Sequence, residues 1–242
     1  MNVNIRPYIV LNNVSSRSIK GLLISELPPI SKPLQRTQIE TVDGRDGDII
    51  TPLGFSAYDK ILKIALTYDY DIDDIINYFN SEGKVVFSNE PDKYYKYAIY
   101  EQIDFERLIR FKTAEVVFHC QPFKYSDTES TKTFNFASSD PKSLTIRNNG
   151  NIYSRPTLTI TGSGDIDIMF DGYQLLSLNL GTNQTIVINA DTMNATSSDG
   201  GTLLNRLVIG DYDKIKLNIG SNIISFTGSV SKILINNYSR WI

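Results

Sequence analysis

The chain has 242 residues, of which 41% are apolar, and a formal net charge of −3. This length suits two domains of ordinary size, and the apolar fraction is sufficient for folded cores. The small negative charge, with lysines and arginines spread along the chain, argues against a protein that binds nucleic acid by neutralising phosphates. The single cysteine, Cys120, excludes an intrachain disulfide framework and a structural zinc site built from cysteines.

The sequence predicts a soluble protein that is made in the cytoplasm. Its first seven residues, Met1 to Pro7, lack the apolar run of a signal peptide. Nowhere does the chain approach the ~20 consecutive apolar residues that a membrane-spanning helix needs. We therefore expect no membrane partner.

The first part of the chain reads as strands joined by turns. A strand around 19–24 should end, or lie at a sheet edge, at Pro28 and Pro29, because proline cannot donate a hydrogen bond to a neighbouring strand. A polar stretch then leads to alternating aspartates and glycines at 43–48, which predict tight turns. The apolar, β-branched run 57–68 predicts a further strand.

One short helix is predicted in this half. Ile72, Ile75, Ile76 and Phe79 share one helical stripe, and Asp71 can cap the first turn. The helix should lie on a sheet, since only one of its faces is apolar.

The pattern returns to period two after the helix. Alternating apolar residues predict strands at 95–99 and 111–120, and we expect the charged segment 101–110 to extend both into a long hairpin. Tyrosines cluster at Tyr94, Tyr95, Tyr97 and Tyr100, where they could either stabilise a sheet or serve as interface residues.

The composition changes beyond Pro122. A polar segment at 124–131 reads as a linker, and the remainder is rich in Asn, Ser, Thr, Gly and Ile without a helical pattern. Short alternating runs, including 158–170 and 214–219, are separated by turns such as Asp171-Gly172 and predict an antiparallel sandwich. We therefore expect two mainly β domains. The first, at 1–123, should be sandwich-like with one short helix, and the second, at 132–242, should be an antiparallel sandwich.

No catalytic centre stands out in the sequence. His119, the only histidine, is adjacent to Cys120 on a predicted strand, so the two side chains should point to opposite faces and cannot form a catalytic pair. A few of the 27 acidic residues could still converge in space, but no pair is singled out as a hydrolytic site. We expect no enzyme activity and no cofactor.

Two binding motifs are incomplete. Asp69, Asp71 and Asp73 begin like a calcium loop, but Asp74 and Asn80 occupy the positions that require glycine and glutamate. Two glycines at 162 and 164 begin like a dinucleotide-binding fingerprint, which needs a following helix where a strand is predicted here. We expect neither a metal site nor a nucleotide site.

The order of these features resembles one protein family, the distal tail proteins of bacteriophages with long non-contractile tails. In the first half the resemblance rests on 23–29, on 41–48, on the helix 72–79 and on the strand ending at 118–123. In the second half it rests on 148–156 and on the ending 237–241. The resemblance spans nearly the whole chain and depends on the order and spacing of the motifs.

The resemblance implies a structural virion protein at the tail tip. Members of the family form a hexameric ring, in which N-terminal domains make the ring and C-terminal galectin-like sandwiches project outward. The ring joins the tail tube protein to the tail-tip lysin or spike, often holds receptor-binding proteins, and lets DNA pass without reading its sequence. For this chain we predict contacts between subunits at Pro28, Pro29, Arg36, Arg45 and Asp46.

A galectin-like domain raises an alternative, a carbohydrate-binding adhesion module. Galectins hold sugars with histidine, arginine and asparagine on neighbouring strands and with a tryptophan on which the sugar stacks. The second half of this chain has no histidine, and the only tryptophan is the penultimate residue, Trp241. These departures favour the structural role over the lectin role.

Overall fold

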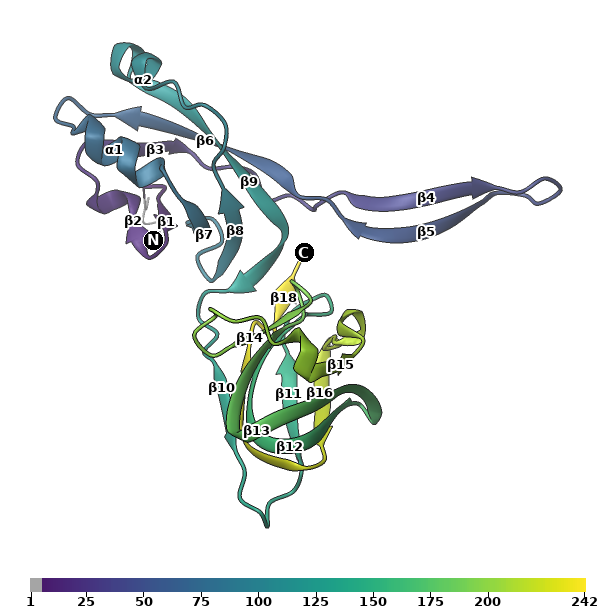
Figure 1. The fold of residues 1–242 in the computed structure, drawn as a ribbon. Helices are drawn as coiled ribbons and strands as arrows, with labels where there is room; N and C mark the ends of the chain where they lie inside the picture. Colours follow the sequence, from purple (N-terminus) through teal and green to yellow (C-terminus); the bar gives the residue numbers. More distant parts are fainter. Residues whose placement is uncertain (1–5) are drawn as a thin grey trace, which may run out of the picture. The chain divides into compact units, whose positions relative to one another are not determined.

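The computed structural model describes residues 6–242 and divides into two compact units, one up to Asp127 and one over Thr128–Trp241 (Figure 1). The division falls within the segment 124–131 that the sequence marks as a linker, although residues 124–126 complete a strand. Residues 1–5, part of the stretch in which no signal peptide is expected, lie outside the described residues.

The first unit is built on an antiparallel sheet with the strand order β2-β1-β7-β8-β9-β6-β3. Along its long central strands β6 and β9, buried and more exposed residues alternate over most of their length, as period two requires. On β6 the inward face includes Lys60 and the outward face includes Ile61. A separate pair, β4 and β5, forms its own two-stranded sheet. The strands are β1 (Ile9–Leu11), β2 (Val14–Ser15), β3 (Leu22–Glu26), β4 (Gln35–Thr41), β5 (Asp48–Phe55), β6 (Tyr58–Leu66), β7 (Glu82–Phe87), β8 (Lys93–Ala98) and β9 (Thr113–Ser126).

Helix α1 (Ile72–Phe79) confirms the predicted helix and its cap. The Asp71 carboxylate accepts hydrogen bonds from the backbone N–H groups of Asp73 and Asp74, which satisfies donors of the first turn. Ile75 and Phe79 are buried in the core, whereas the outer edge of the predicted stripe, Ile76, remains 36% exposed. Tyr78, outside the predicted stripe, is buried as well, so the face that packs on the sheet is rotated from the one that the sequence pattern predicts.

A second helix, α2 (Phe105–Phe111), occupies the segment that we expected to extend a hairpin. That expectation is wrong because Asp104 caps the helix, its carboxylate accepting a hydrogen bond from the Arg107 N–H, while Leu108 is fully buried. Lys112 adopts the left-handed conformation and ends the helix just before β9. The mixed charges that resembled a hairpin are instead the solvated face of a short helix.

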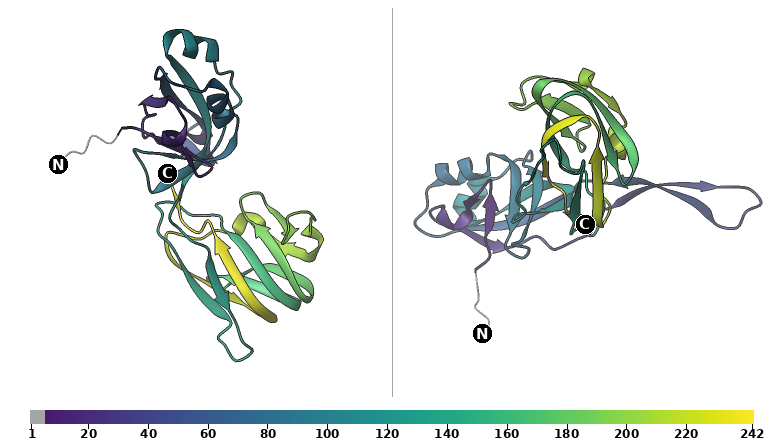
Figure 2. Two further views of the ribbon diagram at one scale, coloured as in Figure 1. Left: turned by 90° about the vertical axis from the view of Figure 1, so that its left-hand side faces the viewer. Right: turned by 90° about the horizontal axis from the view of Figure 1, so that it is seen from below.

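The second unit is a curled antiparallel sheet. The first half of β12 pairs with β17, whereas its last residues pair with β16, so the two partners lie on different parts of one sheet. A register shift between Gly162 and Gly164 marks the bend in β12. Figure 2 shows green β12 and β13 beside the yellow strands. The strands of this sheet are β10 (Lys132–Asn135), β11 (Ser143–Asn148), β12 (Thr157–Phe170), β13 (Tyr173–Asn189), β14 (Asn194–Ser197), β15 (Val208–Gly210), β16 (Gly220–Phe226) and β17 (Ser229–Asn236). The short strand β18 (Arg240–Trp241) follows and is not one of them.

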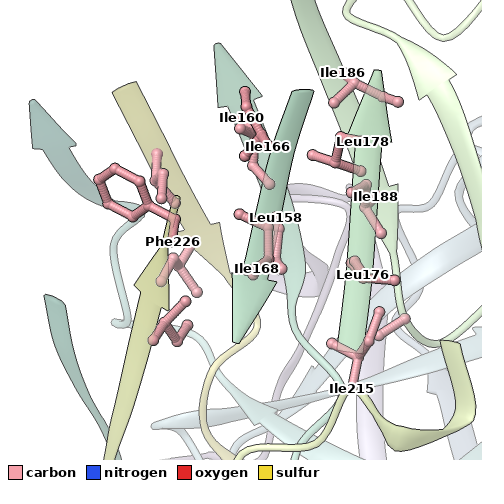
Figure 3. Packing of buried hydrophobic residues seen from close by; sticks show 14 of the residues in the cluster. Leu158, Ile160, Ile166, Ile168, Leu176, Leu178, Ile186, Ile188, Ile215 and Phe226 are labelled. Carbon is pink, nitrogen blue, oxygen red and sulfur yellow. The ribbon is translucent and has the colours of Figure 1, made fainter. Parts of the chain in front are cut away.

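Aliphatic side chains from β12, β13, β16 and β17 fill the core of this unit (Figure 3). The predicted turn at Asp171-Gly172 is confirmed: both residues have positive φ, 48° and 85°, as a two-residue hairpin of type I′ requires. The strand expected over 214–219 is not one, since a 3₁₀ turn (Tyr212–Lys214) precedes a single bridge at Leu217. Its apolar residues, Ile215 and Leu217, are nevertheless fully buried.

The beginning and the end of the second unit are bound to each other. Asn149 donates its backbone N–H to Ser239 Oγ at 3.0 Å, and Asn151 donates its own to the Arg240 carbonyl at 3.2 Å. A Cβ added at Gly150 would lie 1.8 Å from that carbonyl oxygen, so only glycine fits between the two segments. Two segments that carry the family resemblance, 148–156 and 237–241, thus form one structural feature.

Candidate assembly site

The hairpin of β4 and β5 is the part of the first unit best suited to contact another chain. We call residues 35–55 the arm. Its strands pair with one another from Gln35 opposite Phe55 to Thr41 opposite Asp48, and in the sheet topology of the described residues neither pairs with any other strand. Every residue of β4 is exposed. Figure 1 shows the arm as a ribbon separate from the main sheet.

The local sequence explains why the arm turns where it does. The turn spans 42–47, with Arg45 donating its N–H to the Val42 carbonyl at 3.1 Å. Gly44 and Gly47 have φ values of 81° and 77°, which glycine adopts without the steric cost of a side chain. A register shift between Arg36 and Thr37 marks a bulge near the base of the arm.

One face of the arm carries unburied apolar side chains. Ile39 and Ile50 lie opposite one another in the register and are 60% and 63% exposed. The next pair on this face, Thr37 and Pro52, extends it toward the base. The other face carries Gln38 opposite Thr51 and Glu40 opposite Ile49, so three of these four residues are polar. The arm is thus two-sided, although neither side is buried in the unit.

The five predicted contact residues all lie in the arm or in the chain just before it. Pro28 and Pro29 lie in the chain that leads from β3 to the arm, Arg36 lies in β4 opposite Gly54, and Arg45 and Asp46 lie in the turn. Pro28 is buried, whereas the other four are exposed. Their participation in contacts between subunits stays a prediction.

Sequence reasoning missed the arm strands themselves. The residues of β4 alternate weakly, with Ile39 as the only large apolar residue among Gln, Arg, Thr and Glu, so the stretch reads as polar. The available signal was the Asp-Gly-rich turn with residues of high strand propensity on both sides. A hairpin that is exposed on both faces lacks the alternating pattern that burial of one face imposes.

The side chains of His119 and Cys120 do not come together as a catalytic pair. Along β9, His119 is partly exposed while Cys120 is fully buried, so their side chains lie on opposite faces. His119 Nδ1 lies 2.8 Å from Asp59 Oδ1, and its ring lies 5.1 Å from that of Tyr100.

Over residues 6–242, no group of three or more His, Cys, Asp or Glu side chains could hold a metal ion. Among the described residues, no helix is both long and apolar enough to cross a membrane.

Cys120 is expected to resist thiol reagents while the protein is folded. Burial raises the pKa of its thiol to about 12, so almost no reactive thiolate is present at pH 8. Labelling with a chromogenic disulfide should be slow in buffer and complete in denaturant. Rapid labelling of the native protein would show that the strand bearing Cys120 opens, in contradiction to its place in the core.

The chain matches solved structures along almost its full length. No protein-family model matches it, and no curated protein matches its sequence. The crystal structure of the Dit protein of phage SPP1, a hub adsorption apparatus in phages that infect Gram-positive bacteria, matches with a TM-score of 0.62 and 16% identity, covering 98% of this chain and 99% of that chain.

A chain of the phage P2 baseplate in its activated conformation with Ca matches with a TM-score of 0.52 and 11% identity, covering 95% of this chain and 96% of that one. The same baseplate with Sr gives a TM-score of 0.50 at 11% identity, covering 96% of this chain and 97% of that one. At such low identity the likeness establishes the fold: this chain has the two-unit β fold of the phage hub and baseplate chains it matches.

Proposed function

We propose that this chain is a structural protein of a bacteriophage tail tip that assembles into a homo-hexameric ring through its arm. The observation that carries the proposal is the exposed two-stranded arm, with Ile39 and Ile50 on one face. The shared fold supports it, because the matched chains belong to a hub adsorption apparatus and to a baseplate.

Physical chemistry favours a partner for the arm. An isolated two-stranded hairpin is marginally stable in water, and its open edges and apolar side chains are usually covered. A second copy is the occupant that the family resemblance implies. Because the arm would meet a different surface of the next subunit, the contacts run head to tail, and such contacts close into a ring when the rotation per subunit fits.

The dimensions of the unit suit the passage of DNA. A domain of about 125 residues has a radius of gyration near 14 Å, equivalent to a sphere roughly 35 Å across. Six touching spheres of this size leave a central hole of about one sphere's diameter, ~35 Å, before loops intrude. Duplex DNA would pass through such a ring without sequence-specific contacts.

The proposed ring joins other tail proteins. Its partners are the tail tube protein on one side, the tail-tip lysin or spike on the other, and in some phages the receptor-binding proteins. The protein would be made and assembled in the bacterial cytoplasm and would function at the tail tip during attachment to the host. Its role would be to assemble, without catalysis.

Serine in place of the two arm isoleucines tests this role. Burying one isoleucine side chain at an interface contributes about 1.5–3 kcal/mol. The Ile39→Ser/Ile50→Ser protein should therefore dissociate at concentrations at which the parent chain is a ring, with roughly tenfold or greater loss of affinity per contact. Its circular dichroism spectrum should match that of the parent, because both side chains are exposed in the unit and its fold does not depend on them. Light scattering coupled to size exclusion measures the mass.

The matched control is Gln38→Ser/Thr51→Ser, which alters the directly opposed pair on the other face of the same strands. The control should keep the parent mass. If the isoleucine variant also kept the parent mass at every concentration, the apolar face of the arm would not be part of the interface.

A further inference from the structure

Three side chains hold the backbone that leads into the arm. We call residues 27–34 the arm root. Asn89 donates its amide Nδ2 to the Pro28 carbonyl at 3.0 Å, Lys60 donates its ammonium to the Pro29 carbonyl at 2.9 Å, and Tyr58 OH lies 3.4 Å from the Ser31 carbonyl. Side chains of β6 and of the turn between β7 and β8 thus bind three backbone carbonyls of the root, all within four consecutive residues.

Lys60 has an unusual position for a lysine. It lies on the inward face of β6 and is only 3% exposed. Its Nζ lies 4.8 Å from the ring centre of Tyr95, 5.3 Å from that of Tyr58 and 5.8 Å from that of Phe87. Burial is the main cause that lowers its pKa, so the site does not stabilise the charged form as water would.

The neighbouring carboxylate is engaged by other groups. Glu90 accepts a hydrogen bond from Lys124 Nζ at 2.8 Å and another from Tyr95 OH at 2.8 Å. The ammonium of Lys60 donates its hydrogen bond to the Pro29 carbonyl in the root. Removing an ammonium group from water costs free energy that an apolar side chain of similar volume would avoid, so global stability alone does not account for a lysine here.

We propose that Lys60 is a positioning residue that fixes the direction in which the arm leaves the main sheet. Its ammonium lies among three aromatic rings and donates a hydrogen bond to the backbone carbonyl of Pro29. Proline restricts its own backbone and that of the preceding residue, so a hold on Pro29 constrains the chain on both sides. Asn89 and Tyr58 add contacts before and after it.

The direction of the arm matters for a closed ring. Head-to-tail contacts form a ring only when each subunit adds the correct rotation, and otherwise they form open chains. A loose root would let arms reach neighbours at many angles. This consequence rests on the proposed function, whereas the fixing of the arm itself does not.

Electron-spin distance measurement on the full chain tests the proposal. Spin labels on Asp46→Cys in the arm turn and Glu106→Cys on exposed α2 report the distance between arm and sheet, and the native Cys120 is fully buried. The labelled chain is diluted into an excess of unlabelled chain of the same variant, so that any assembled particle contains one labelled subunit. The parent should give a narrow distance distribution.

Lys60→Met should broaden that distribution. Methionine keeps the apolar stem among the rings but donates no hydrogen bond, and loss of a hydrogen bond from a charged donor should raise the population of open root conformations roughly tenfold. The melting temperature should stay the same or rise, which separates positioning from a merely structural role. The matched control, Lys63→Met, removes an exposed lysine three residues along the same strand and should leave the distribution narrow.

Asn89→Ala provides a second variant at an exposed side chain, in case Lys60→Met does not fold. It should broaden the distribution in the same sense. A distribution as narrow as that of the parent in every folded variant of Lys60 and Asn89 would overturn the proposal. A parent chain that is monomeric yet shows the expected broadening in the variants would contradict the ring while supporting the hold on the arm root.

Discussion

Excision of the whole arm is expected to leave the first unit folded and to abolish the ring. The change removes residues 35–55 and joins Leu34 to Ser56 through two glycines. These two residues already lie together, since Ser56 donates its N–H to the Leu34 carbonyl at 2.9 Å. Because β4 and β5 pair only with one another in the described topology, no strand of the main sheet loses a partner.

Light scattering should give the mass of one shortened chain, and circular dichroism should show retained β structure. The excision must include both strands, since removal of 35–48 alone would leave the rest of β5, residues 49–55, without its partner and expose its backbone. The Gln38→Ser/Thr51→Ser protein serves as the assembled control. A shortened chain that still formed the parent assembly would show that the arm is not needed for it.

Alanine at Phe118 is expected to destabilise the first unit by about 3–5 kcal/mol, the usual cost of truncating a buried phenylalanine. Phe118 is fully buried at the centre of an aromatic cluster, with ring centres 5.1 Å from Tyr97, 5.8 Å from Phe87 and 6.5 Å from Phe79. Alanine would leave a cavity among rings that cannot all move inward.

Calorimetry should resolve the effect, because each unit has its own core. The midpoint temperature of the first unit's unfolding should fall by roughly 10–20 °C for a unit of this size, while that of the second unit should not change. Ile61→Ala on the exposed face of β6 is the control and should move neither transition by much, since Ile61 is 49% exposed. Equal shifts of both transitions would contradict the independence of the two units.

In the same calorimetric experiment, Gly150→Ala should destabilise the second unit and leave the first unit unchanged. A Cβ at Gly150 would lie 1.8 Å from the Arg240 carbonyl oxygen, and the backbone of either segment would have to move. The second unit's transition should then fall while the first unit's stays unchanged.

The elements that the sequence predicts correctly are those with strong local signals. Helix α1 combines an apolar stripe with the Asp71 cap, and the turn at Asp171-Gly172 has the residues that a type I′ turn demands. The alternation along β9 places His119 and Cys120 on opposite faces, as expected. In each case the information lies within about ten residues.

The elements that it misses depend on distant contacts. Helix α2 is short, and its charged residues suit a hairpin as well as a helix. What favours the helix is the burial of Leu108 in the core, which the local sequence does not reveal. The root of the arm is held by Lys60 and Asn89, which are 31 and 61 residues distant from the carbonyls they bind. No local pattern reveals such pairings, so the hold on the arm root is visible only in the folded chain. The sequence does place predicted contacts at Arg36, Arg45 and Asp46, within the arm.

The mass of the intact, purified chain in solution tests the central claim most directly. Light scattering over a range of concentrations at moderate salt gives the mass without reference to shape. A ring of six subunits predicts six times the chain mass of 27.3 kDa, and electron microscopy of the same sample should show particles with six-fold symmetry. A stable monomer at high concentration would contradict a chain that assembles with itself through its arm.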